Sequence, residues 1–126
     1  MTAVEQSLRT YLIADTTVKD LIGSRVYPSR LPDNPTLPAV VYQKISTTYD
    51  IPSGRVAATR SRIQLDAWDD SQLVAWSVSA AIHAALDVGS ATGIHASFPE
   101  DSECSYDVDS GLYRVRDDFF IWTIEE

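Results

Sequence analysis

The side chains in this chain that could do chemistry are mainly carboxylates. They fall into three groups: Asp66, Asp69 and Asp70 at the end of a predicted strand, Glu100, Asp101 and Glu103 in an acidic run, and Asp107 and Asp109 before a turn. Clustered carboxylate oxygens can bind Ca²⁺ or Mg²⁺, so a cation-dependent hydrolase is one hypothesis. Helix capping, surface charge and turn formation explain the same residues, and the third group lacks the later ligands of an EF-hand loop. We therefore predict no metal site and keep the hydrolase only as an alternative from another class.

Histidine, cysteine and serine residues are not arranged for catalysis either. His83 and His95 have no Cys, His or carboxylate nearby in the sequence at a ligand spacing. Cys104 stands in an acidic run that would repel a thiolate nucleophile. The sequence holds no Gly-x-Ser-x-Gly elbow and no phosphate-binding loop. We predict that the protein is not an enzyme and has no catalytic residue and no cofactor.

Composition and charge restrict the fold and the partners. The chain has 126 residues, of which 44% are hydrophobic and 22% are charged, as in a single globular domain over residues 1–126. Its net charge of -8 argues against general nucleic-acid binding, and we expect no sequence-specific nucleic-acid partner. No apolar run is long enough to span a membrane, and no signal sequence opens the chain, so we expect the protein in the cytoplasm. A single cysteine, Cys104, excludes an internal disulfide.

The charge is divided unevenly along the chain. Residues 1–65 hold eight Lys/Arg and five Asp/Glu, a balance of +3, whereas residues 66–126 hold two and thirteen, a balance of -11. A basic half and an acidic half could attract each other between copies and favour head-to-tail association. The other interpretation is a solvated acidic surface that aids solubility, and the sequence leaves both open.

The elements that would position these groups centre on a strand that leads into a long helix. Ile63, Leu65 and Ala67 alternate with polar residues, which predicts a half-buried strand. An amphipathic helix follows and runs to about Asp87, with Asp69 as its expected N-cap. Four small helical residues, Ala80, Ala81, Ala84 and Ala85, should let this helix approach a sheet closely.

The rest of the chain completes an α+β fold. Capping signals and Gly23 predict two shorter helices at the start, and the prolines from Pro28 to Pro38 predict a fixed connection without regular pairing. Further strands are expected at residues 25–27, 39–48, 93–98 and 112–124, with an acidic interruption at residues 99–103. We predict a mainly antiparallel or mixed sheet of four to five strands, with one long and two short helices on one face.

Three features do not fit a simple monomer. Residues 49–59 contain a turn signal and are expected to form a projecting hairpin or, alternatively, a mobile surface loop. Phe120 and Trp122 share the strand face opposite the presumed core, so we expect a partner to cover them. Asp117 interrupts the apolar face of the same strand and needs a partner group, a bulge or a place at the rim of the sheet.

Four segments, in this order after the helix pair, carry a resemblance to a known family. They are Arg25-Val26-Tyr27-Pro28 with Leu31-Pro32, Leu37-Pro38-Ala39-Val40-Val41-Tyr42-Gln43, Ile63-Gln64-Leu65-Asp66-Ala67-Trp68, and Gly111-Leu112-Tyr113-Arg114-Val115. From about Val4 to Trp122 the chain resembles the tail-completion, or tail-terminator, proteins of long-tailed bacteriophages and prophages. It departs from the family at Asp117, where the resemblance implies an apolar residue.

The resemblance implies a structural virion protein without enzymatic activity. Such a protein would form a hexameric ring at the head-proximal end of the tail, with DNA passing through its lumen. Its expected partners are other copies of itself, the tail-tube protein and the head connector or stopper protein; a head-completion or stopper protein is the alternative. The residues that we predict at the contacts are Arg55, Arg60 and Arg62, which would face an acidic neighbour, Asp66, Asp101 and Glu103 on the acidic half, and the aromatic pair Phe120 and Trp122.

Overall fold

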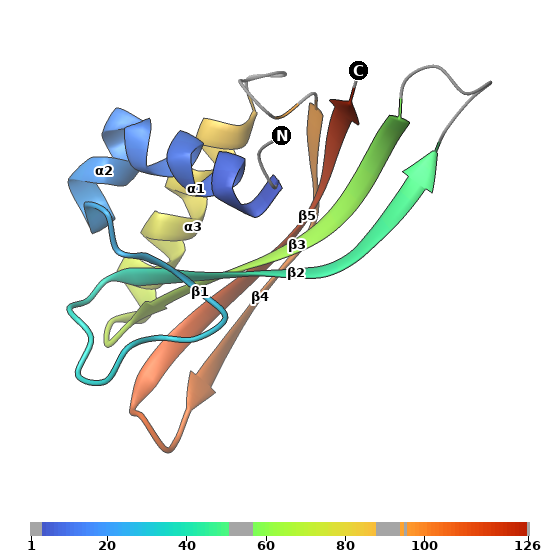
Figure 1. Cartoon of the computed structure of the whole chain (residues 1–126). Helices are drawn as coiled ribbons and strands as arrows, with labels where there is room; N and C mark the ends of the chain where they lie inside the picture. The colour runs from blue at the N-terminus through green and yellow to red at the C-terminus, as the bar shows by residue number, and fades with distance from the viewer. Residues whose placement is uncertain (1–3, 51–56, 88–93, 95, 126) are drawn as a thin grey trace.

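The computed structural model describes residues 4–50, 57–87, 94 and 96–125. In chain order the elements are α1 (Val4–Ala14), α2 (Thr16–Ile22), β1 (Val26–Pro28), β2 (Ala39–Asp50), β3 (Ala57–Asp69), α3 (Gln72–Leu86), β4 (Ala96–Asp107) and β5 (Leu112–Glu125). Figure 1 shows the three helices gathered at one side of a twisted sheet. The predicted α+β class, with one long and two short helices, is confirmed.

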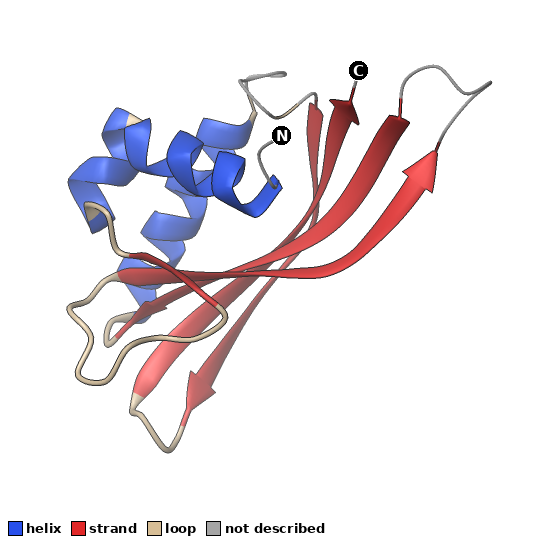
Figure 2. Ribbon diagram, in the orientation of Figure 1, coloured by secondary structure: helices blue, strands red, loops and turns tan. Residues whose placement is uncertain are grey.

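The sheet has five strands in the order β1-β2-β3-β5-β4. Only the short β1 pairs in parallel, against β2, while the other three pairings are antiparallel. Figure 2 shows that the helices lie over one face and leave the other face open. The sheet is therefore mixed, and β3 and β5 lie at its centre.

The core lies between the sheet and α3, with α1 and α2 packed alongside. On β3 and β5 every second residue is buried beneath the helices, as half-buried strands require. The buried core side chains from strands and helices include Leu8, Leu12, Val18, Ile22, Val40, Ile63, Leu65, Val78, Ile82, Val115, Phe119 and Ile121.

The helix boundaries follow capping groups, and one predicted cap is wrong. Gly23 ends α2 with a φ of +59°, as expected, and its N–H donates to the Lys19 carbonyl at 2.7 Å. The N-cap of α3 is Ser71, which accepts from the Val74 N–H at 3.4 Å, rather than Asp69. The Asp69 carboxylate instead accepts from the Ser71 N–H at 2.8 Å and fixes the turn before the helix.

Strand β4 is longer than the sequence pattern indicates. The acidic interruption expected at residues 99–103 does not break the strand, which runs unbroken from Ala96 to Asp107. A register shift between Pro99 and Asp101 absorbs the irregularity as a bulge. Because β4 is an edge strand, a proline can stand in it with little loss of hydrogen bonding between strands. Charged side chains on such a strand can also face solvent.

Strands β2 and β3 extend past the helices as a pair of antiparallel arms (Figure 1). A register shift between Lys44 and Ser46 precedes the extension, and the pairing continues to Asp50 opposite Ala58. These arms flank the hairpin predicted at residues 49–59, whose turn residues 51–56 lie outside the described residues.

Candidate functional site

The polar cluster around Asp117 joins three elements beneath the sheet. The Asp117 carboxylate has no exposed surface, and it accepts from Ser79 Oγ at 2.7 Å and from Ser102 Oγ at 2.5 Å. His83 Nε2 lies 2.9 Å from Asp117 Oδ1. Ser79 and His83 stand one turn apart on α3, Ser102 comes from β4, and Asp117 comes from β5. The sequence left open whether Asp117 has a partner group, lies at a bulge or lies at the rim of the sheet. The structure shows that it has partner groups.

This cluster contains a serine, a histidine and an aspartate, but not in the order of a catalytic triad. In a triad one imidazole nitrogen faces the serine and the other faces the aspartate. Here Nε2 alone faces both, at 3.2 Å from Ser102 Oγ and 2.9 Å from Asp117 Oδ1. The Ser102 hydroxyl is hydrogen-bonded directly to Asp117, so the imidazole is not placed to take its proton. The geometry fits a structural role, because these hydrogen bonds join α3 to the sheet. We call the cluster of Ser79, His83, Ser102 and Asp117 the latch.

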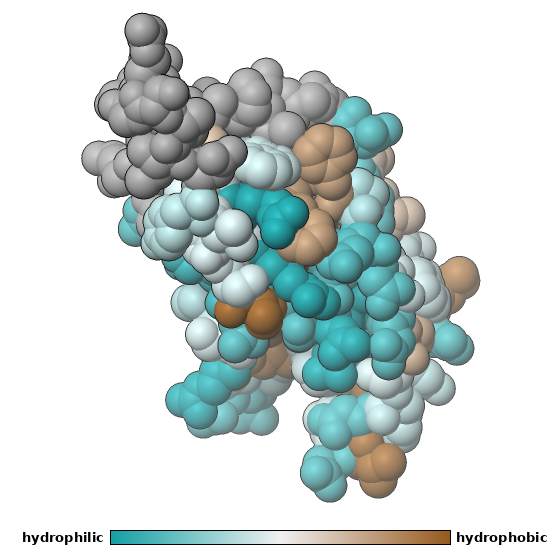
Figure 3. Space-filling model, turned by 90° about the vertical axis from the view of Figure 1, so that its right-hand side faces the viewer, coloured by the Kyte–Doolittle hydropathy of each residue, from teal (hydrophilic) through white to brown (hydrophobic). Residues whose placement is uncertain are grey.

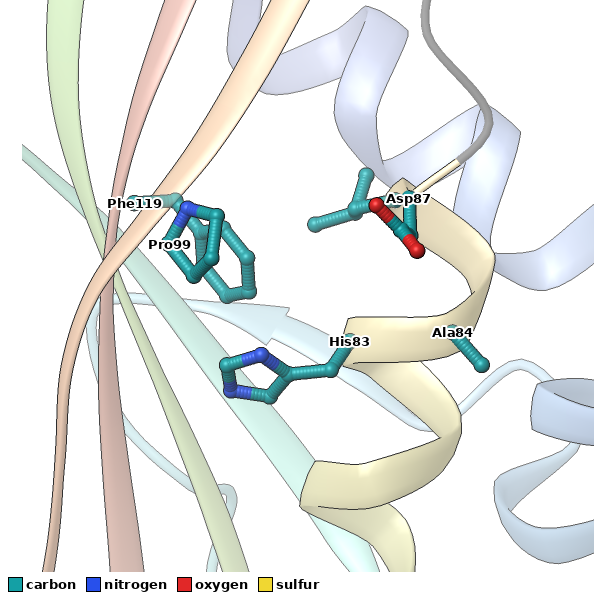
Figure 4. A pocket seen from close by; sticks show the side chains of 6 residues that line it. His83, Ala84, Asp87, Pro99 and Phe119 are labelled. Carbon is teal, nitrogen blue, oxygen red and sulfur yellow. The ribbon is translucent and has the colours of Figure 1, made fainter.

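A shallow hollow lies beside the latch. Its volume is about 310 Å³, and it is lined by His83, Ala84, Leu86, Asp87, Pro99 and Phe119. Figure 4 shows the imidazole of His83 pointing from α3 toward the sheet, close to Phe119 and Pro99. The His83 and Phe119 ring centroids are 4.9 Å apart, so the imidazole packs against the core on one side. Of the residues that line the hollow, His83 and Asp87, the C-cap of α3, are the titratable ones.

The acidic groups of the sequence do not converge on a cation. Across the described ranges, no group of three or more His, Cys, Asp or Glu is placed to hold a metal ion. In the same part of the chain, no helix is long and apolar enough to cross a membrane. Asp69 is used in the turn before α3, and Asp107 accepts from Ser110 Oγ at 2.7 Å in the turn before β5.

Asp66 is buried although it belongs to the open face of the sheet. Only 8% of its surface is exposed, and both of its carboxylate oxygens accept from Gln64 Nε2 at 3.2 Å. Burial raises the pKa of Asp66, while the Gln64 amide and the nearby Arg114 and Arg116 oppose this rise. Burial likewise raises the pKa of Asp69, and the hydrogen bond from the Ser71 N–H works against it.

The open face of the sheet carries a network of ion pairs within one copy. Arg62, predicted to face a neighbour, has Nη2 at 3.4 Å from Asp118 Oδ2 and Nε at 3.9 Å from Glu100 Oε2. Glu103 pairs with Arg116 at 3.1 Å and keeps 60% of its side chain exposed. Asp101, another of the three acids predicted at the contacts, is exposed on β4.

At one end of the same face the charges give way to aromatic side chains. Phe120 and Trp122 are half-buried, and Phe98 on β4, directly opposite Phe120, is 54% exposed. The guanidinium of Arg60 lies 4.8 Å from the centroid of the Phe120 ring and 5.9 Å from that of Trp122. Arg55 lies outside the described residues. A role of these side chains in contacts between copies stays a prediction.

The outer face of α3 is a surface that the sequence analysis missed. The helix contains no Asp, Glu, Lys or Arg. Ala81 and Ala85 face the core as expected, but Ala80 and Ala84 face outward. Leu73, 77% exposed, and Trp76, 39% exposed, share the outer side of the helix. The absence of charge over fifteen residues was the available signal, because a solvent-facing helix surface normally carries charged side chains.

Together these features are typical of a protein that packs against other proteins. Its buried polar side chains form structural contacts, and its exposed surfaces are a long sheet edge, an aromatic patch and an uncharged helix face, which suit packing against other proteins.

Comparison with known proteins identifies the family. The family model described as tail completion protein gp17 matches residues 6–124, and the chain belongs to this family. Among solved structures, a chain from the virion of a native gene transfer agent (GTA) particle has the same fold, with a TM-score of 0.68 and 17% sequence identity over 94% of this chain and 92% of that chain. A search of curated proteins found no match. The predicted resemblance to tail-completion proteins is confirmed.

Proposed function

We propose that copies of this chain form a ring, a hexamer in the assembled tail, that closes the head-proximal end of a phage tail tube. The ring stops the addition of tube protein and offers the surface to which the head connector or stopper protein binds. The observation that carries this proposal is the match to the tail completion family over residues 6–124. The protein then acts during assembly in the host cytoplasm and stays in the virion.

The surface of the protomer supports a closed assembly. A ring needs two different, complementary patches on each copy, because its contacts are heterologous. The open face offers an aromatic end near Arg60 and an acidic edge along β4, which carries Glu100, Asp101 and Glu103. The charge balance of +3 over residues 1–65 and -11 over residues 66–126 likewise gives each copy a basic part and an acidic part.

We infer that the protein contributes no chemical step. The one described arrangement that combines a serine, a histidine and an aspartate has the imidazole nitrogen and the hydroxyl competing for the same carboxylate oxygen. A hydrolase would need that imidazole to accept the serine proton.

The position in the virion can be tested by labelling. Tails produced in cells that make no heads should bind a gold-labelled antibody against this protein at one end only, the end that later joins the head. Heads produced in cells that make no tails serve as the matched control and should stay unlabelled. Label on tail-free heads would instead identify a head-completion or stopper protein on the connector side, and label on neither particle would contradict both roles.

A further inference from the structure

The side chains at the aromatic end of the open sheet face are paired across neighbouring strands rather than scattered. Phe98 pairs with Phe120 across β4 and β5, and Trp122 pairs with Arg60 across β5 and β3. The four side chains therefore share one face, opposite the buried Phe119 and the core. Figure 3 views the molecule from the side away from the helices, and apolar side chains gather at the upper right of this face, beside hydrophilic ones.

Arg60 gives this aromatic patch a positive charge that no carboxylate among the described side chains pairs with. Its guanidinium lies over the rings of Phe120 and Trp122, which fixes its position. Arg62, two residues further along β3, pairs with Asp118 and Glu100, whereas Arg60 forms no ion pair with any described residue. A guanidinium held on an aromatic surface favours a partner that brings a carboxylate together with an apolar side chain.

The turn between β4 and β5 carries both kinds of side chain that would suit this patch, a carboxylate and an apolar group. Val108 is 82% exposed and Tyr106 is 52% exposed, and the turn also carries Asp107 and Asp109. The turn is held in shape by the Gly111 N–H, which donates to the Asp107 carbonyl at 2.8 Å, and by a φ of +72° at Gly111.

The two surfaces cannot meet within one copy. Strand β5 joins them, and Leu112 and Trp122 are ten residues apart on it, or about 33 Å at the rise of an extended strand. Figure 1 accordingly shows the β4–β5 turn and the C-terminal end of β5 at opposite ends of the sheet. We propose that the turn carrying Val108 and Asp109 docks onto the patch of Arg60, Phe98, Phe120 and Trp122 in a second copy of this chain. The contact is heterologous, so each copy both gives and receives one, and it supplies the interface of the ring on which the proposed function rests.

A nuclear magnetic resonance experiment detects this contact even when it is weak. A nitroxide spin label is attached to Ser110→Cys in a Cys104→Ser background, and this protein is mixed with ¹⁵N-labelled, unmodified chain. The three tryptophans give three indole N–H signals. We expect the label to broaden the Trp122 indole signal and to leave the Trp76 signal, on the outer face of α3, unchanged. An unchanged Trp122 signal, or broadening of Trp76 instead, would overturn the docking.

A charge exchange tests the pairing itself. Arg60→Glu and Asp109→Arg should each weaken self-association on the order of tenfold, measured by sedimentation velocity, because each sets like charges against each other. The double variant Arg60→Glu with Asp109→Arg restores opposite charges across the contact and should recover most of the lost affinity. Arg30→Glu, Asp33→Arg and their double variant, all exposed and outside both patches, are the matched controls and should associate like the wild type. Circular dichroism confirms that each variant folds. Failure of the double variant to recover would contradict the pairing.

The outcome for the ring role is separate. If the spin label broadens Trp122 but the protein does not end tail tubes, the docking stands and the proposed function fails. If tubes are capped while the exchange variants associate normally, the proposed function stands and the ring uses another interface.

Discussion

Asp117 shows how one charged side chain can replace an apolar residue inside a core. Its carboxylate accepts from two hydroxyls and faces an imidazole nitrogen, and these groups belong to α3 and β4. A buried carboxylate without such partners would be strongly unfavourable. The cluster fastens the long helix to the last two strands, so it belongs to the stability of the fold rather than to a reaction.

Removal of this carboxylate should therefore cost stability. Asp117→Ala leaves three polar groups without their acceptor, and we expect it to lower the free energy of unfolding by about 3 kcal/mol in urea denaturation. Asp101→Ala, at an exposed position on β4, is the control and should change that free energy by less than about 0.5 kcal/mol. Equal, small effects of the two variants would show that the latch contributes little.

The buried Asp66 carboxylate should make the protein less stable as the pH rises. Burial raises its pKa in the folded protein above the ordinary value of 3.8, so the fold binds a proton more tightly than the unfolded chain does. The penalty for the charged form is absent below pH 3.8 and grows as the pH rises through the raised pKa.

Asp66→Asn removes that penalty. We expect the variant to be more stable than the wild type at pH 7 and the difference between them to shrink as the pH falls toward 4. Urea denaturation of both proteins at pH 7, 5.5 and 4 measures it. A variant that is less stable at pH 7, or a difference that does not change with pH, would contradict the role assigned to burial.

At the scale of the elements, α3 offers a direct comparison of two serines. Ser71→Ala removes the oxygen that caps the helix and should lower the free energy of unfolding by about 1 kcal/mol. Ser77→Ala, on the exposed side of the same helix, removes only a hydrogen bond to the Leu73 carbonyl and should be neutral or slightly stabilising. Thermal unfolding of the two variants side by side gives the answer, and a larger loss from Ser77→Ala would exclude Ser71 as the cap.

Hydrophobic alternation predicted the central elements well. Ile63, Leu65 and Ala67 alternate with polar residues because one face of β3 is packed and the other is open. The edge strand β4 gave no such pattern, because its outer side contacts solvent and tolerates Pro99 and acidic residues alike. The N-cap was ambiguous because Asp69 and Ser71 both have an oxygen that accepts from a backbone N–H, and only the path of the turn decides between them.

The site was predicted only where it follows from strand periodicity. The faces of Phe120 and Trp122 could be assigned because residues alternate along a strand. The contact between His83 and Asp117 could not, since it joins residues that are 34 positions apart in different elements. Nor could the sequence show which alanines of α3 face the sheet, because Ala80, Ala81, Ala84 and Ala85 are equal in size and polarity.

At the scale of the whole molecule, the fold places its core on one side of the sheet and its exposed charged and aromatic side chains on the other. The helices cover one face of the sheet (Figure 2), and the opposite face carries ion pairs, an aromatic end and the acidic residues of β4. Membership of the tail completion family supports the proposed function, in which these surfaces contact other proteins of the tail.

The most direct measurement of the central claim is the length of tail tubes assembled in its presence. Purified tail-tube protein is allowed to polymerise with and without this chain, and electron microscopy records the lengths and the ends of the tubes. We expect tubes to stop growing when the protein is added, with a ring at one end of each stopped tube. Tubes that lengthen at the same rate and carry no additional density at either end would contradict the claim.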